Sequence, residues 1–179
     1  MCSSDSEIQD DVLVEKRSTL IVVKLGGSSI TEKGSFETLK RSKLDTTCFQ
    51  IQQIFRETGA NVILIHGAGS FGHHQAKQYG LKSGGGDDWL VGVSRTRSSV
   101  LRLNAIILQS LAALDVPVAP VSPFDFITLK DGDVLRSTLT EHMSSLLRTG
   151  LIPLAHGDVV LDRKRKCSIM SGDGVMQMY

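Results

Sequence analysis

The chain has 179 residues, which at about 150 residues per domain predicts one domain, or one domain and part of a second. Twenty Lys and Arg residues against nineteen Asp and Glu leave a net charge of +1, so the chain has no overall field to attract a nucleic acid or an anionic membrane surface. Hydrophobic residues at 41% and charged residues at 22% exclude a wholly disordered or fibrous chain.

The cysteines and the N-terminal residues indicate the compartment. Cys2, Cys48 and Cys167 form no CxxC motif and are odd in number, which favours a reducing environment. The first seventeen residues are acidic and lack the apolar stretch of a secretory signal, so we expect a flexible tail at 1–18 and one folded domain at 19–179. No later run reaches the roughly 18 apolar residues that a membrane span needs. The sequence predicts a cytoplasmic protein that binds neither a membrane nor a nucleic acid.

The first half of the domain has a strand–helix–strand pattern. Residues 19–25 and 61–65 are nearly continuous apolar runs, which are typical of parallel strands buried on both faces. Between them, apolar residues at helical spacing predict a helix at 44–56, and Gly59 is the expected stop.

The second half continues the alternation, and the glycine-rich stretch 84–88 is either a mobile lid or a slack connection. Thr138 and Glu141 form a capping-box pattern at the start of a helix. We expect, in order, a helix at 100–114, a strand at 116–119, a hairpin at 126–135, a helix at 139–147, a strand at 151–155 and a hairpin at 159–170. Strands that alternate with helices predict an α/β fold, a three-layer αβα sandwich around a mostly parallel sheet.

Three of the predicted strands end in glycine-containing turns. These turns are 24–28, 66–73 and 156–158. Because the carboxyl ends of parallel strands meet at the same edge of a sheet, where ligands bind, we expect the turns to converge. Glycines let backbone N–H groups approach an anion closely, and the N-terminus of a following helix favours negative charge. The sequence therefore predicts a phosphate-binding site.

The middle turn also matches GxGxxG, the fingerprint of dinucleotide-binding folds, at Gly67, Gly69 and Gly72. That interpretation needs a second strand with an acidic residue about 20 positions on, where Asp87 and Asp88 lie. The residues before these aspartates do not resemble a buried strand, and the position of the P-loop lysine is occupied by a histidine. The sequence therefore predicts a glycine turn that binds phosphate, but neither a dinucleotide-binding fold nor a P-loop.

Five charged or titratable side chains are candidates for chemistry. Lys24 lies in an apolar strand, which is costly unless a carboxylate or a ligand pairs with it; the alternative is a lysine that extends from a strand end into solvent. Lys33 taken alone predicts a surface lysine, and His73 is either a ligand contact or a solvent-facing loop residue. Asp158 and Asp173 each follow a glycine, so they could orient a lysine, hold Mg²⁺ or belong to ordinary turns. His66, at the end of a strand, is expected to be structural.

Together these blocks resemble the amino acid kinase superfamily and, within it, the isopentenyl phosphate kinases. The blocks are VKLGGS followed by ITEK, then HGAGSFGH, HGD and SGD. The lysine–glycine block is widespread in the superfamily and indicates the fold, whereas GAGSFGH with its histidine indicates the substrate. The resemblance runs from about Thr19 to the last residue.

The resemblance implies an enzyme that uses ATP and Mg²⁺ to phosphorylate isopentenyl phosphate, giving isopentenyl diphosphate and ADP. It implies that Lys24 contacts the transferring phosphate, that Lys33 helps to neutralise the nucleotide and that His73 grips the acceptor phosphate. Such a transfer needs placement and charge neutralisation rather than a strong base, because the attacking phosphate oxygen is already ionised. The implied assembly is a homodimer, and no residue is assigned as a metal ligand.

Other residues of the same blocks are implied in binding the two substrates, several through their backbone. Asp173 would orient the lysines. The resemblance implies that Gly26 and Gly27 hold ATP phosphates, that Ala68 and Gly69 donate between the substrates, and that Gly67, Gly157 and Asp158 border the acceptor.

The end of the chain departs from the family pattern. In the family it resembles, a stretch after the SGD block supplies most of the adenine pocket and another nucleotide-binding lysine, whereas here six residues follow Asp173. We therefore expect an acceptor-binding lobe with an incomplete nucleotide lobe. Two alternatives stay open: a superfamily enzyme that acts on a carboxylate or carbamate, and a non-catalytic module for binding or dimerisation.

Overall fold

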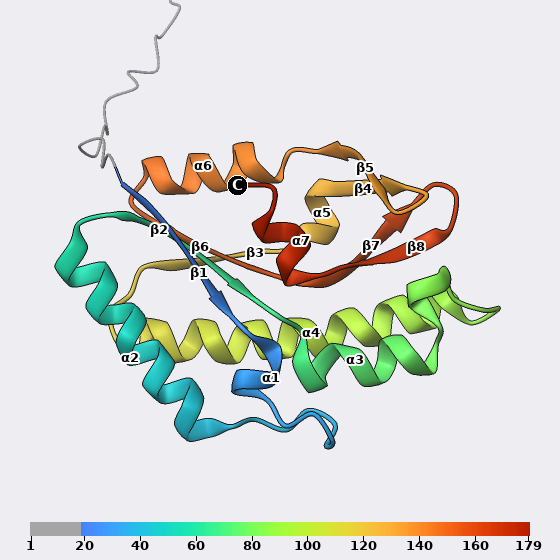
Figure 1. Ribbon diagram of the computed structural model, residues 1–179, viewed down its shortest axis with the longest axis horizontal. Coiled ribbons are helices and arrows are strands. Elements are labelled where there is room, and N and C mark those ends of the chain that lie inside the picture. Colours follow the sequence, from blue (N-terminus) through green and yellow to red (C-terminus); the bar gives the residue numbers. More distant parts are fainter. Residues whose placement is uncertain (1–18) are drawn as a thin grey trace, which may run out of the picture.

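The computed structural model describes residues 19–179, so the tail predicted at 1–18 lies outside the described residues. A parallel sheet lies between two layers of helices (Figure 1). Its strands, in spatial order, are β1 (Leu20–Leu25), β2 (Asn61–His66), β6 (Ile152–His156) and β3 (Val118–Val121). One face is covered by α2 (Arg41–Thr58) and α4 (Trp89–Ala112), and the other by α6 (Leu139–Arg148). The predicted three-layer αβα fold is confirmed.

Strand β2 shows why a continuous apolar run was needed. Successive side chains of a strand point to opposite faces, and both faces of this sheet are covered. Val62 and Leu64 pack in the cluster with α2 and α4, whereas Ile63 and Ile65 pack in the cluster with α6. All four side chains are at most 1% exposed.

The helix boundaries follow local chemistry, with one correction. Helix α2 ends at Gly59, whose φ of 60° is left-handed and suits glycine, as predicted. Helix α6 begins where expected, but the predicted capping box is wrong, because the Thr138 side chain makes no capping hydrogen bond. Instead, the Ser137 hydroxyl accepts a hydrogen bond from the N–H of Leu139 at 3.2 Å.

A second sheet extends the fold beyond the parallel one. It contains, in spatial order, β5 (Asp133–Ser137), β4 (Ile127–Lys130), β7 (Asp158–Asp162) and β8 (Lys166–Met170). Both predicted hairpins form, and β4 and β7 join them in parallel. The Asp162 carboxylate strengthens this junction by accepting hydrogen bonds from the N–H groups of Asp131 and Gly132 in the other hairpin.

The glycine-rich connection between α3 (Gly69–Gln78) and α4 is packed rather than slack. A short 3₁₀ turn, η1 (Leu81–Ser83), leads into Gly84, whose φ is +91°. A Cβ on Gly84 would lie 2.1 Å from the carbonyl oxygen of Arg165. This close approach to the second hairpin requires glycine, and it anchors the connection to the body of the domain.

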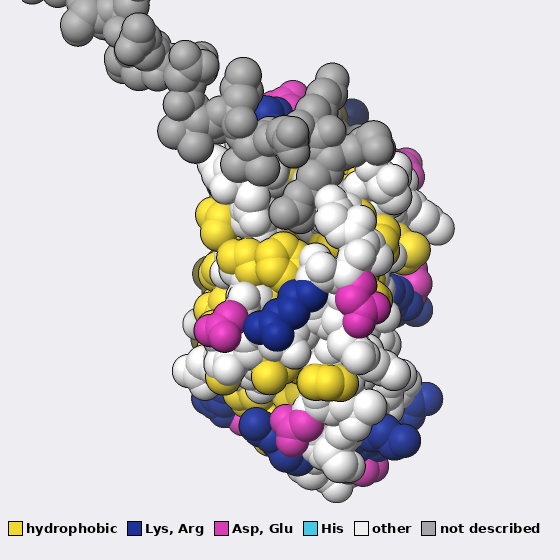
Figure 2. Space-filling view, turned by 90° about the vertical axis from the view of Figure 1, so that its left-hand side faces the viewer, with side chains coloured by type: hydrophobic (Ala, Val, Ile, Leu, Met, Phe, Trp, Pro, Cys, Tyr) yellow, Lys and Arg dark blue, Asp and Glu magenta, His cyan; other side chains and the backbone are white. Residues whose placement is uncertain are grey.

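The distribution of charged side chains on the surface agrees with the net charge of +1. On the face shown in Figure 2, positive and negative side chains are interspersed with apolar ones. Among the described residues, no helix has the length and apolar character to cross a membrane. The remaining short helices are α1 (Gly27–Ile30), α5 (Pro123–Phe126) and α7 (Gly172–Met176).

Candidate phosphate-binding site

A cavity of about 330 Å³ opens at the carboxyl edge of the parallel sheet. It lies where β1, β2 and β6 end, together with the start of α7 after β8. All eleven residues that the resemblance assigns to catalysis or binding border it: Lys24, Gly26, Gly27, Lys33, Gly67, Ala68, Gly69, His73, Gly157, Asp158 and Asp173. The predicted convergence of the three glycine turns is therefore confirmed, and the SGD block is a fourth segment at the same place.

The turns are tied to one another through their backbones. The N–H of Gly67 donates to the carbonyl of Leu25, and the N–H of Gly157 donates to the carbonyl of His66, both at 2.9 Å. A Cβ on Gly27 would lie 2.5 Å from the backbone nitrogen of Gly69. Glycine is required here because the first two turns touch backbone to backbone.

Replacing Gly27 with Ala is expected to destabilise the fold by about 1–3 kcal/mol, because the added methyl group forces the first two turns apart. Gly34→Ala is the matched control, since a Cβ there has no atom within 4 Å. Urea unfolding of both variants measures the difference. Equal stability of the two variants would mean that the turns do not need their close approach.

Several backbone donors of the turns are unused. None of the hydrogen bonds within residues 19–179 uses the N–H of Gly27, Ala68 or Gly69. Gly69 begins α3, so the positive end of that helix dipole faces the same space. Unpaired N–H groups at a helix start, next to glycines, form a favourable environment for a phosphate group.

Positive side chains surround these donors. Lys24, in β1, forms an ion pair with Asp173, at the start of α7, so a carboxylate does pair with the charge in the strand. Lys33 and His73 are both exposed and border the cavity. Just before α7, the Ser171 hydroxyl accepts a hydrogen bond from the N–H of Gly174 at 3.0 Å, which caps the first turn of the helix, where Asp173 lies.

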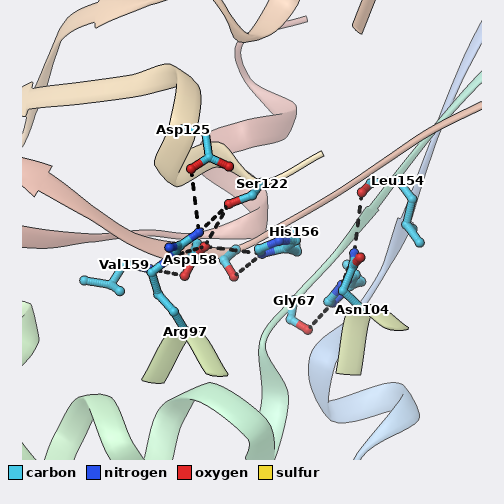
Figure 3. A network of polar contacts seen from close by, with 11 residues as sticks. Gly67, Arg97, Asn104, Ser122, Asp125, Leu154, His156, Asp158 and Val159 are labelled. Carbon is cyan, nitrogen blue, oxygen red and sulfur yellow. Dashed lines mark hydrogen bonds and ion pairs between the residues drawn. The ribbon is translucent and has the colours of Figure 1, made fainter. Parts of the chain in front are cut away.

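Asp158 borders the cavity with its backbone, because its side chain is fully buried. Its carboxylate accepts from Nε of Arg97 at 3.3 Å and from the N–H of Val159 at 2.8 Å (Figure 3). Asp158 thus pairs with an arginine of α4, and it is Asp173 that pairs with the lysine. Burial raises the pKa of the Asp158 carboxyl, although His156 and Arg97 oppose that shift.

Two buried histidines lie behind the glycine turns. The rings of His66 and His156 stack with their centroids 5.4 Å apart, and each contacts the carbonyl oxygen of the glycine that follows it. Burial, and to a smaller extent the neighbouring His156, lowers the pKa of His66 from the ordinary 6.5 to about 3. Burial also lowers the pKa of His156. Both rings are therefore neutral at pH 7.

These lowered pKa values make the fold sensitive to acid. Between the ordinary pKa of 6.5 and the folded value of about 3, the unfolded chain binds a proton that folded His66 does not, so stability falls as the pH falls. Lowering the pH from 7 to 5.5 should cost about 1 kcal/mol from His66, and His156 adds in the same direction. Urea unfolding at the two pH values tests this. His66→Asn should reduce the difference, and an unchanged difference would contradict the assignment.

Sequence reasoning missed Arg97 and Asn104 as contributors to the site. Both lie on the stripe of α4 that also carries Val100, Leu103 and Ile107, which are fully buried. Asn104 is 3% exposed, and the Arg97 side chain is 21% exposed. Polar residues at helical spacing within an apolar stripe were the available indication, because such side chains must find polar partners in the interior.

The cavity also has an apolar part. Ala76, Val100, Val159 and Ile169 contribute to its wall. Thr96 lies among them, and its hydroxyl has no hydrogen-bond partner within the described residues. The cavity therefore joins a polar region of glycines and cations to an apolar region that suits a short hydrocarbon chain.

Comparisons with known proteins show a family that has this fold and a similar sequence. The chain belongs to the amino acid kinase family, which it matches over residues 19–177. It is 31% identical to the isopentenyl phosphate kinase of Arabidopsis thaliana, over 90% of this chain and 59% of that protein. It is 32% identical to the isopentenyl phosphate kinase of Methanothermobacter thermautotrophicus, over 89% of this chain and 62% of that protein.

Solved structures agree. A crystal structure of an isopentenyl phosphate kinase matches with a TM-score of 0.80 and 32% identity, covering 89% of this chain and 67% of that one. An aspartate kinase from Synechocystis matches with a TM-score of 0.53 at 12% identity, a likeness of fold alone. The chain spans about 60% of the length of the two curated relatives described above.

Proposed function

We propose that this chain binds isopentenyl phosphate in the cavity and takes part in transferring the γ-phosphoryl group of ATP to it, giving isopentenyl diphosphate and ADP. The observation that carries the proposal is the junction of a phosphate-binding region with an apolar wall in one cavity. An acceptor with a phosphate at one end and a short branched hydrocarbon at the other matches both regions. The similarity to isopentenyl phosphate kinases supports the same acceptor.

In the proposed complex, the acceptor phosphate lies against the turn that begins at Gly67. The unused N–H groups of Ala68 and Gly69 and the imidazole of His73 donate to it. Lys24 lies toward the nucleotide, with Gly26 and Gly27 against the ATP phosphates. These groups neutralise charge on the oxygens of the transferred group and need no proton transfer, because the attacking oxygen is ionised at neutral pH.

The residues of the cavity also suit an ATP-bound Mg²⁺. Within residues 19–179, no three His, Cys, Asp or Glu side chains gather into a metal site. Asp173 pairs with Lys24 but its side chain is largely exposed beside the cavity, whereas the Asp158 carboxylate is fully buried against Arg97. Mg²⁺ commonly takes its ligands from substrate phosphates, waters and one or two carboxylates, so Asp173 would be its protein contact. Mg²⁺ would supply charge neutralisation between the β- and γ-phosphates.

Calorimetry and an activity assay test the proposal together. Isopentenyl phosphate and ATP are titrated separately into the 179-residue chain, and ADP release is then measured with both present. We expect saturable binding of isopentenyl phosphate. Binding without ATP binding or ADP release would support the module alternative. No binding of isopentenyl phosphate, but binding of a carboxylate or carbamate, would support the other family activity.

Replacing His73 with Ala is expected to weaken isopentenyl phosphate binding about 10-fold or more, because a hydrogen bond to a charged phosphate is lost. The measurement is the calorimetric Kd. His142→Ala is the control, since that ring stacks on Phe126 away from the cavity. An unchanged Kd for His73→Ala would show that the acceptor lies elsewhere.

The homodimer and the cytoplasmic location stay predictions. Cys48 and Cys167 are both free and buried, which is compatible with a reducing compartment. Light scattering of the purified chain tests the assembly, with a mass of twice 19.4 kDa expected. A monomer at working concentrations would contradict the dimer, and a tagged chain located in an organelle would contradict the cytoplasmic assignment.

A further inference from the structure

We infer that Asn104 and His66 are positioning residues, which together aim the backbone N–H of Ala68 at the acceptor phosphate. The two side chains lie behind the glycine turn and border no part of the cavity themselves. The inference rests on the proposed function, because it assigns them a task in binding isopentenyl phosphate.

The contacts of His66 decide which ring nitrogen carries the proton. Nδ1 lies 3.1 Å from the carbonyl oxygen of Gly67, which can only accept, so Nδ1 is protonated. Nε2 lies 3.1 Å from the amide nitrogen of Asn104, which can only donate, so Nε2 accepts. The same amide nitrogen lies 3.5 Å from the carbonyl oxygen of Leu154, which sets its orientation (Figure 3). A directed chain of hydrogen bonds thus runs from α4 through the end of β2 to Gly67.

This chain determines where the next backbone N–H points. The peptide unit between Gly67 and Ala68 is trans and planar, so its C=O and N–H point in opposite directions. The carbonyl is held against the buried imidazole, and the N–H of Ala68 therefore points away from the interior. Ala68 borders the cavity, and no hydrogen bond within the described residues uses that N–H.

A space-filling role would not require this polar chain. Burying an imidazole and an amide is costly unless each is hydrogen-bonded, and an apolar pair would fill the same volume. The arrangement also recurs: Nδ1 of His156 lies 3.2 Å from the carbonyl oxygen of Gly157, the corresponding glycine after β6. At the ends of both β2 and β6, a buried histidine thus contacts the carbonyl oxygen of the glycine that begins the turn.

Variants of His66 separate positioning from packing. Asparagine carries an N–H donor close to the place of Nδ1, whereas leucine fills space without donating. We expect His66→Leu to raise the Kd for isopentenyl phosphate about 10-fold or more, and His66→Asn to recover most of the affinity. Calorimetry on the 179-residue chain measures both, with thermal unfolding to establish that each variant is folded. Unaltered affinity in folded His66→Leu would overturn the inference, and so would equal losses in the two variants.

The ring tautomer gives a test that needs no stable variant. In the chain labelled with ¹⁵N-histidine, His66 should show a protonated Nδ1 and an unprotonated Nε2 at pH 7. The opposite tautomer would overturn the inference. Asn104→Leu should produce a mixture of tautomers, and an unchanged tautomer there would remove Asn104 from the chain of contacts. Failure of the unaltered chain to bind isopentenyl phosphate would instead count against the proposed function.

Discussion

Replacing Lys24 with Met is expected to slow phosphoryl transfer to isopentenyl phosphate about 10²–10³-fold, while the chain stays folded. Lys24 is the cation that β1 carries to the cavity, and Asp173 holds its ammonium group in place. In the proposed complex, the charge that develops on the transferred phosphoryl oxygens would lose one fixed counter-charge in the variant. The side chain is 31% exposed, so its replacement leaves no buried group without a partner.

Single-turnover kinetics with saturating ATP and isopentenyl phosphate measure the effect. Lys43→Met is the matched control, because Lys43 is an exposed lysine of α2 and does not border the cavity. A folded Lys24→Met variant with the rate of the unaltered chain would place the transferring phosphate elsewhere. Asp173→Asn should also slow the transfer, because it loosens Lys24 and removes the carboxylate that is proposed to contact Mg²⁺.

Replacing Arg97 with Met is expected to destabilise the protein by about 3 kcal/mol, the largest loss of stability that we predict. Asp158 is fully buried, and Arg97 is its charged partner, at 3.3 Å. The guanidinium also stacks on Phe124, with its carbon 3.8 Å from the ring centroid. Methionine can keep much of this packing but leaves the carboxylate without compensation, apart from its hydrogen bonds to Ser122 and Val159.

A double-mutant cycle in urea isolates the charge effect. Adding Asp158→Asn to Arg97→Met should recover part of the lost stability, because Asp158→Asn removes the charge that Arg97→Met leaves uncompensated. The two single variants and the unaltered chain complete the cycle. A loss below about 0.5 kcal/mol for Arg97→Met, the range of ordinary surface substitutions, would show that the pair contributes little.

Much of the candidate site could be predicted because its elements depend on local patterns. Apolar runs ending in glycine identified β1, β2 and β6, and the shared edge of parallel strands brought Lys24, Gly67 and Gly157 to one cavity. The capping of α6 could not be predicted in the same way. Thr138 matched the capping pattern, yet the backbone geometry there let the neighbouring Ser137 hydroxyl reach the helix instead.

The sequence by itself determined the layered α/β fold, the sheet edge where we propose that phosphate binds and the cations available there, because periodicity and glycine position act over short distances along the chain. Only the tertiary structure decided which charges pair. Lys24 and Asp173 are 149 residues apart, and Arg97 reaches Asp158 from a different layer. The same holds for Asn104 and His66: their partners depend on how α4 packs against the sheet, and no pattern within either segment specifies that contact.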